Sequence, residues 1–345
     1  MLIIGCDFHP GFQQIAMLDG ETGEIVGRRL QHQDEARQFY TALPKPVLVG
    51  VESCGSTQWF ERMLAELGHQ LWMGDAARIR ASVVRRQKTD ARDADHILTL
   101  LIEDRFPKLW VPTMEDRDVR QLLLHRHHLV RSRTQVKNQL QAMALNQGVQ
   151  KKRQLWTEAG RQLLQKLVLD PHTAARRDEC LQRLDYLDQQ IRQLNQRVAE
   201  EAGKRPAARL LMTHPGVGQQ TALAFVLTIG PIGRFENAKK VASYVGLIPA
   251  EYSSGGKQRL GRISKQGSPL LRFLLVEAAQ SAARYDPELK RMYVRLCLRR
   301  SRAQAKVAVA RRLAVKLYWM LRSGKTYAQP KAGGAGEPES SCDAA

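Results

Sequence analysis

The chain has 345 residues, and 54 lysines and arginines against 34 aspartates and glutamates give it a formal net charge of +20. That surplus favours a polyanionic partner over an ordinary solvated surface, because solubility alone needs far less charge of one sign. The length predicts two or more domains. Five scattered cysteines without CxxC spacing indicate neither a disulfide framework nor a zinc site. No apolar run is long enough to cross a bilayer, so we expect a soluble intracellular protein.

An α/β domain is expected over residues 1–110. Short apolar runs bounded by turn residues predict strands at 2–8, 13–18, 24–30, 47–51 and 70–73. Helical periodicity predicts helices at 34–43, 57–67, 76–86 and 90–103. Three consecutive strands followed by alternating helices and strands is the element order of the RuvC-like (ribonuclease-H-like) fold, which is an analogy at the level of fold.

A helical coiled-coil region is predicted over residues 111–204. Apolar residues recur at helical spacing through a basic strip, at Leu122, Leu123, Leu129, Val136, Leu140 and Met143. A second long helix is expected over 174–202, with a near-heptad seam of Leu181, Leu184, Leu187, Ile191 and Leu194. Two interpretations stay open and are compatible: a helical hairpin that packs on its own core, or an arm that joins subunits or holds nucleic acid.

The C-terminal domain is expected to be mainly α-helical and to span 205–327. Predicted helices at 207–212 and 219–229 are joined by Pro215-Gly216-Val217-Gly218, a helix-hairpin-helix-like turn. The amides of Gly216 and Gly218 could hold a DNA phosphate, and a tight helix connection is the alternative; in this basic context neither interpretation is favoured. Further helices are expected at 235–246, from 269 onward and at 287–321, where a basic side faces away from the apolar one. The composition of 328–345 is typical of a disordered tail.

Four acidic residues are the candidate catalytic and metal-binding set. Asp7 and Glu52 each end an apolar strand, and Asp90 and Asp93 lie one turn apart at the start of a helix. Favourable interaction with the helix dipole would explain Asp90 and Asp93 alone, but a carboxylate that ends an apolar strand is costly to bury unless it binds something. The set could hold two Mg²⁺ ions that act on a phosphodiester. Asp95 is expected to point away from it.

A second candidate site is the loop Ser253-Ser254-Gly255-Gly256. Four basic residues follow it, namely Lys257, Arg259, Arg262 and Lys265. Glycines allow close backbone approach, so the loop could present a hydroxyl beside a phosphate; a plain basic hairpin is the alternative. A serine nucleophile also needs a base, and none stands at an obvious spacing here.

Taken together, the motifs resemble the DEDD insertion-sequence transposases of the IS110 family, now understood as bridge-RNA-guided recombinases. The N-terminal marks are Gly5-Cys6-Asp7, Val51-Glu52-Ser53 and Lys88-Thr89-Asp90-Ala91-Arg92-Asp93-Ala94. The C-terminal marks are Pro215-Gly216-Val217-Gly218, Gly246-Leu247-Ile248-Pro249, Ser254-Gly255-Gly256, Ile263-Ser264-Lys265-Gln266-Gly267 and Leu271-Arg272. The resemblance covers nearly the whole chain. One departure is Phe8-His9-Pro10, where many members carry a small or basic residue after the first acid.

The resemblance implies a DNA transposase or recombinase. Its RuvC-like domain would bind Mg²⁺ through Asp7, Glu52, Asp90 and Asp93, and Ser254, or else Ser253, would attack DNA and form a phosphoserine link. The partners implied are double-stranded DNA, a structured guide RNA and further copies of the chain in a dimer or tetramer, in the bacterial cytoplasm at the nucleoid. Two alternatives stay open: a RuvC-like nuclease in which Ser254 is structural, and a non-catalytic nucleic-acid-binding protein.

Overall fold

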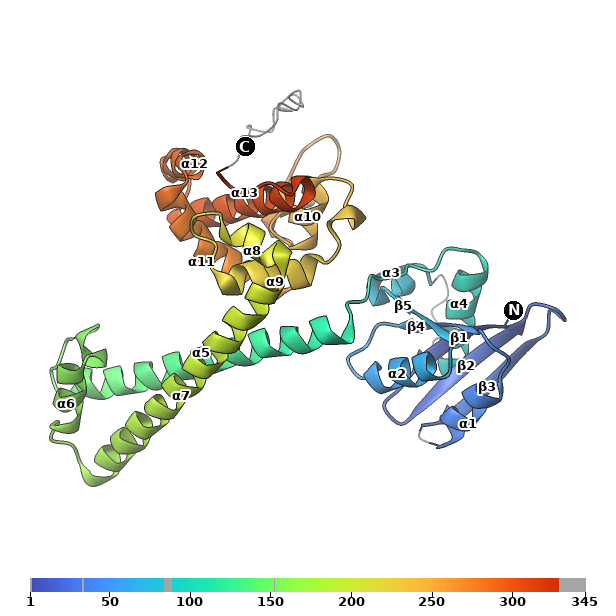
Figure 1. The fold of residues 1–345 in the computed structure, drawn as a ribbon, viewed down its shortest axis with the longest axis horizontal. Helices are drawn as coiled ribbons and strands as arrows, with labels where there is room; N and C mark the ends of the chain where they lie inside the picture. Colours follow the sequence, from blue (N-terminus) through green and yellow to red (C-terminus); the bar gives the residue numbers. More distant parts are fainter. Residues whose placement is uncertain (1, 33, 84–88, 152, 329–345) are drawn as a thin grey trace. The chain divides into compact units, whose positions relative to one another are not determined.

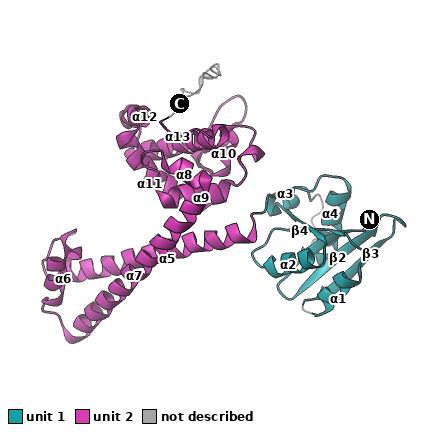
Figure 2. Cartoon of the chain, in the orientation of Figure 1, with its two compact units in different colours: residues 1–111 teal, residues 112–345 magenta. Residues whose placement is uncertain are grey.

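The computed structural model describes residues 2–32, 34–83, 89–151 and 153–328. They fall into two compact units, residues 1–111 and residues 112–345 (Figure 2). Lys88 and all but the first residue of the predicted tail lie outside the described residues. The division of residues 111–345 into a helical region, a C-terminal domain and a tail stays a prediction.

The first unit is built on a five-stranded mixed sheet with the strand order β3-β2-β1-β4-β5 (Figure 1). Neighbours among the first three strands are antiparallel, whereas β4 is parallel to β1 and β5 to β4. The strands are β1 (Leu2–Phe8), β2 (Phe12–Asp19), β3 (Ile25–Gln31), β4 (Leu48–Glu52) and β5 (Gln70–Gly74). The predicted strands are confirmed with bounds that shift by one residue at most.

The described residues of the first unit also form four helices: α1 (Asp34–Ala42), α2 (Gln58–Glu66), α3 (Ala76–Ala81) and α4 (Asp90–Ile102). The helix expected at 76–86 is shorter than predicted. It ends at Ala81, where the Ser82 hydroxyl donates to the Ile79 carbonyl 2.7 Å away and Ser82 caps the last turn. Residues 84–88 of that prediction lie outside the described part of the chain.

Helix α4 lies directly against the centre of the sheet. Gly5 on β1 and Gly50 on β4 are paired across the two strands. A Cβ atom on Gly5 would overlap the backbone of Ala94 and Leu98 in α4, so the helix rests on bare strand backbone at that point. Over Gly50 the contact is with a side chain, that of Leu101. The close contact of α4 with Gly5 and Gly50 determines how far the first turn of α4 lies from the end of β1.

The second unit begins with two long helices, α5 (Met114–Asn146) and α7 (Pro171–Lys204), which lie side by side (Figure 1). The short helices η1 (Gln154–Trp156) and α6 (Glu158–Gln165) lie between them in the chain. Most residues of the two predicted apolar seams are buried, whereas Leu122 and Leu129 are only partly buried against the cores of this unit. Their role in joining subunits stays a prediction.

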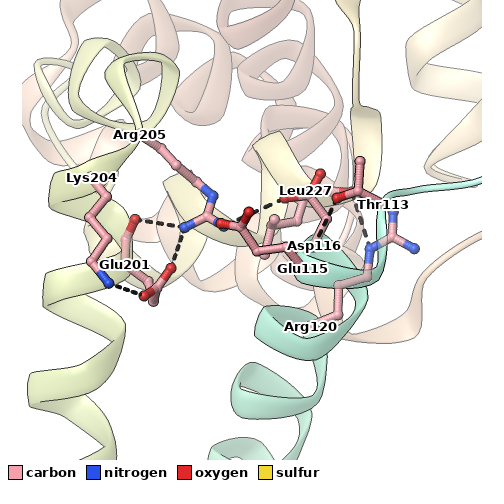
Figure 3. A network of polar contacts seen from close by, with 8 residues as sticks. All are labelled: Thr113, Glu115, Asp116, Arg120, Glu201, Lys204, Arg205 and Leu227. Atoms are coloured by element: carbon pink, nitrogen blue, oxygen red, sulfur yellow. Dashed lines mark hydrogen bonds and ion pairs between the residues drawn. The ribbon is translucent and has the colours of Figure 1, made fainter.

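An ionic network ties the start of α5 to the end of α7 (Figure 3). The Arg205 guanidinium lies 3.3 Å from a Glu115 carboxylate oxygen and 3.5 Å from one of Asp116, and it also pairs with Glu201. Nearby, Arg120 on α5 donates to the Leu227 carbonyl at 3.1 Å. These contacts join the long helices to the C-terminal helices within one unit.

From residue 205 to residue 328, the described part of this unit is helical apart from one small hairpin. Its helices are α8 (Pro206–Met212), α9 (Gln219–Ile229), η2 (Ile232–Arg234), α10 (Ala238–Tyr244), α11 (Pro269–Tyr285), α12 (Pro287–Cys297) and α13 (Arg302–Ser323). The hairpin strands are β6 (Pro249–Glu251) and β7 (Leu260–Ile263). The helices share one core that includes Phe225, Leu275, Leu313 and Tyr318. Within the residues described, no helix is long and apolar enough to span a membrane.

Two helix predictions need correction here. The single stretch expected at 287–321 is broken between α12 and α13, because Ser301 starts a new helix with a capping box in which its side chain and that of Gln304 bond each other's backbone amides. The helix expected at 235–246 is confined to α10, because the Asn237 side chain caps it by accepting from the Lys240 amide at 3.1 Å.

Candidate active site

The predicted acids of the first unit lie at the ends of adjacent elements. Cys6 on β1 pairs with Val51 on β4, and Asp7 and Glu52 follow these two residues in parallel strands. The carboxyl ends of neighbouring parallel strands meet at one sheet edge, a common place for ligand sites. Asp90 and Asp93 occupy the first turn of α4, whose N-cap is Thr89.

The closest group at this edge is Asp7, His9 and Asp90. The His9 Nε2 atom lies 3.1 Å from Asp7 Oδ2 and 3.5 Å from Asp90 Oδ1. One potential ligand atom from each of the three lies within 4.8 Å of the other two. Glu52 and Asp93 are not in this tight group in the described structure. The edge therefore offers a ready pair of carboxylates with an imidazole between them.

His9 was not predicted as a site residue. The sequence signal was present, because Phe8-His9-Pro10 departs from the pattern expected after the first acid. The structure explains its orientation: the His9 ring stacks on Phe12 with 4.5 Å between ring centroids, and the His9 amide donates to the Phe12 carbonyl at 2.9 Å. Thus the turn between β1 and β2 directs the imidazole toward the acids.

The electrostatics of Asp7 show what surrounds it. Partial burial raises the pKa of Asp7, and the nearby charges of Asp93 and Asp90 raise it further, whereas His9 opposes this. Desolvation and like charges both disfavour the ionised carboxylate. A divalent cation would reverse both effects, so the donor set is chemically suited to one. Asp93 is thereby placed within electrostatic reach of Asp7, although outside the tight group.

The serine loop is the tip of the β6–β7 hairpin. Every residue from 251 to 262 is exposed, including Lys257, Arg259 and Arg262, and Lys265 just beyond β7 is exposed as well. The Lys257 amide donates to the Ser254 carbonyl at 3.1 Å, which closes the turn around Gly255 and Gly256. The tip therefore presents hydroxyls and cations together to solvent.

The two serines of this tip have different surroundings. The Ser253 hydroxyl donates to a Glu251 carboxylate oxygen at 2.6 Å, and it accepts from the Arg259 amide at 3.1 Å. Within the described part of the chain, no hydrogen bond fixes the Ser254 hydroxyl. Glu251 is thus a base within reach of one serine, a residue that spacing alone did not indicate.

In the turn between α8 and α9, Gly216 is needed for close packing, whereas Gly218 is not. Gly216 has a φ of +92° and lies so close to the backbone of Ala282 in α11 that a Cβ atom would overlap it. Gly218 is exposed, and a Cβ atom there would meet nothing within 4 Å. The amide end of α9 is therefore accessible at Gly218, while the predicted phosphate contacts of both glycines stay predictions.

Two protein-family models match the chain. Residues 4–148, which contain all four acids and His9, match a model described as a DEDD transposase of the IS110 group. Residues 208–294, which contain the glycine turn and the serine hairpin, match a model described as the transposase IS116/IS110/IS902 family. The two ranges do not overlap, and together they cover more than half of the chain.

Curated proteins give the same similarity, two of them over nearly the full length. A Pseudomonas aeruginosa protein named "Probable family 20 transposase" is 29% identical over 95% of this chain and 98% of its own. The Coxiella burnetii transposase for insertion sequence element IS1111A is 26% identical over 94% of this chain and 91% of its own. A Moraxella bovis protein named for inverting pilin genes is 28% identical over 70% of this chain and 68% of its own.

Proposed function

Because the chain belongs to the IS110/IS116 family of DEDD transposases, we propose that it cuts and rejoins the DNA of an insertion sequence with a metal-dependent acid site and a serine nucleophile. The observation that carries the proposal is the exposed hairpin tip, where two serines lie among cations in the range matched by a transposase model. Support for rejoining comes from the gene-inverting relative, since inversion leaves no broken ends.

The acid site is proposed to hold Mg²⁺ through Asp7, Glu52, Asp90 and Asp93, with two ions in all. Support comes from the carboxylates that end β1 and begin α4, and from a strand order that matches the RuvC-like pattern. Mg²⁺ held by these four acids would supply Lewis-acid chemistry, which would stabilise the negative charge that develops at a scissile phosphate. The chain itself holds Asp7 and Asp90 at a fixed spacing, because the backbone of α4 packs directly on Gly5.

The serine step is proposed as a transesterification. The hydroxyl gives up its proton, its Oγ forms a bond to phosphorus, one P–O bond to a sugar breaks, and the leaving sugar oxygen takes up a proton. Rejoining reverses the step: a sugar hydroxyl attacks the phosphoserine and the serine oxygen regains a proton. Ser254 is the first assignment, and the Glu251 contact specifically favours Ser253 as the second, since Glu251 could take the proton.

The proposed partners follow from charge and from the long helices. Double-stranded DNA and a structured guide RNA both suit a net charge of +20, and α5 carries much of the basic strip. A dimer or tetramer held together in part by α5 and α7 completes the proposal. In it, the acids and the serine, which lie in different compact units, act in one reaction.

The test is to trap the covalent intermediate on end-labelled insertion-sequence DNA under denaturing conditions. Wild type is expected to give a labelled protein band that Ser254→Ala, or else Ser253→Ala, removes. Ser323→Ala, at an exposed serine at the end of α13, serves as the matched control and should keep the band. Asp7→Asn is expected to lower adduct formation by about a hundredfold or more, because metal contacts contribute several kcal/mol to such steps.

Other results would point elsewhere. Cutting that continues without any adduct in the double variant Ser253→Ala with Ser254→Ala would identify a RuvC-like nuclease with structural serines. Unchanged strand exchange in Asp7→Asn would rule out the proposed metal role of Asp7.

A further inference from the structure

The base of the serine hairpin is held by contacts that the proposed chemistry does not by itself require. The tip from 251 to 262 is exposed, so its direction depends on the two chain segments that carry it, 245–249 and 263–267. Across this base the Ser264 amide donates to the Ile248 carbonyl at 2.8 Å, and the Lys265 amide donates to the Gly246 carbonyl at 3.3 Å.

One side chain from outside the hairpin joins both segments. Arg272, in the first turn of α11, directs Nη1 at the Val245 carbonyl on one segment, 3.2 Å away. The same atom bonds the Gln266 carbonyl and lies 3.2 Å from the Gly267 carbonyl on the other. A charged donor shared by three carbonyls forms stronger bonds than neutral donors would.

The backbone at this base is too close to tolerate side chains. Gly246 and Gly267 have φ values of +74° and +67°, a region that favours glycine. A Cβ atom on Gly246 would overlap the backbone of Gln266, and one on Gly267 would overlap the Tyr244 carbonyl. The two glycines therefore let the segments approach, and the approach brings their carbonyls to one guanidinium.

The surroundings of the Arg272 side chain favour its contacts with the two backbone segments of the hairpin base. Partial burial lowers the pKa of its guanidinium, and among the described residues no acidic side chain offsets this effect. Its guanidinium donates to backbone carbonyls instead. The cost of partly burying this charge is therefore offset only when the hairpin base places those carbonyls beside it.

We propose that Arg272 is a positioning residue that pins the base of the β6–β7 hairpin to α11 and so sets where the tip serines point. The proposal rests on the proposed function of those serines. The residue does not touch the reacting atoms, because all three of its contacts are with backbone carbonyls at the base.

The experiment compares full-length Arg272→Gln with wild type in single-turnover formation of the protein–DNA adduct. The expected result is a rate constant lowered by about a hundredfold, the factor for losing a charged hydrogen bond, with unchanged final amplitude and unchanged half-saturating DNA concentration. A merely structural residue would lower the amplitude, because part of the protein would be misfolded. Arg272→Lys keeps a positive charge with three donors, so its rate constant should be at least tenfold higher than that of Arg272→Gln.

The matched control is Arg284→Gln, an exposed arginine on the same helix with the same change in charge. It should leave the rate constant within about threefold of wild type. An unchanged rate constant in Arg272→Gln, or an equal loss in Arg284→Gln, would overturn the positioning role.

Hydrogen exchange separates failure of this inference from failure of the proposed function. Arg272→Gln is expected to speed exchange of the Ser264 and Lys265 amides by about tenfold, while the amides of α13 keep their protection. If wild type forms no adduct, or the adduct survives loss of both tip serines, the proposed function is wrong and the exchange result still decides the pinning. Unchanged exchange at both amides would refute it.

Discussion

His9 is the residue that most changes what the acid site can bind. It places an imidazole 3.1 Å from Asp7 and 3.5 Å from Asp90, where an all-carboxylate site would have only oxygen. Imidazole suits transition metals, whereas Mg²⁺ prefers oxygen ligands. We therefore expect His9→Ala to weaken Mn²⁺ binding by about tenfold or more and to leave Mg²⁺ binding nearly unchanged, as measured by calorimetric titration of the full chain.

His96 provides the control for that titration. It lies on α4 but bonds the Ser82 hydroxyl at 2.9 Å rather than the acids. His96→Ala should leave both affinities as they are. If His9→Ala instead tightens Mg²⁺ binding, the imidazole acts as a substitute cation between the carboxylates and not as a ligand.

At the scale of elements, the position of α4 on the sheet controls the acid site. Gly5→Ala forces the α4 backbone away from β1, whereas Gly50→Ala meets only the movable Leu101 side chain. We expect Gly5→Ala to destabilise the first unit by about 1–3 kcal/mol and to lower metal affinity as well, since Asp90 moves with the helix. Gly50→Ala should cost less and keep the affinity. Denaturant unfolding and metal titration of both variants check this.

The strands of the first unit could be predicted because short apolar runs such as Val47–Val51 end at turns or acids, and Asp7 and Glu52 were visible as acids at strand ends. The contact between His9 and Asp90 could not be predicted, since it depends on how closely α4 packs on the strand backbone at Gly5. The break at Ser301 was missed because amphipathic spacing continues through it, while a local capping box ends the helix pattern. Likewise, nothing in the order Ser253-Ser254-Gly255 revealed that Glu251 folds back onto Ser253.

At the scale of the whole molecule, the question is whether net charge or the hairpin binds DNA. Each phosphate neutralised by a bound cation contributes roughly 0.9 to the slope of log affinity against log salt concentration. Lys257→Gln with Arg259→Gln is therefore expected to reduce that slope by roughly 1.8 for double-stranded DNA, measured by anisotropy over a salt series. The matched pair is Arg37→Gln with Arg105→Gln, which removes the same charge from arginines paired with Glu66 and Glu103. The control pair should leave the slope unchanged, because its two arginines already pair with acids. An equal reduction from both pairs of substitutions would mean that overall charge, and not the hairpin, makes the phosphate contacts.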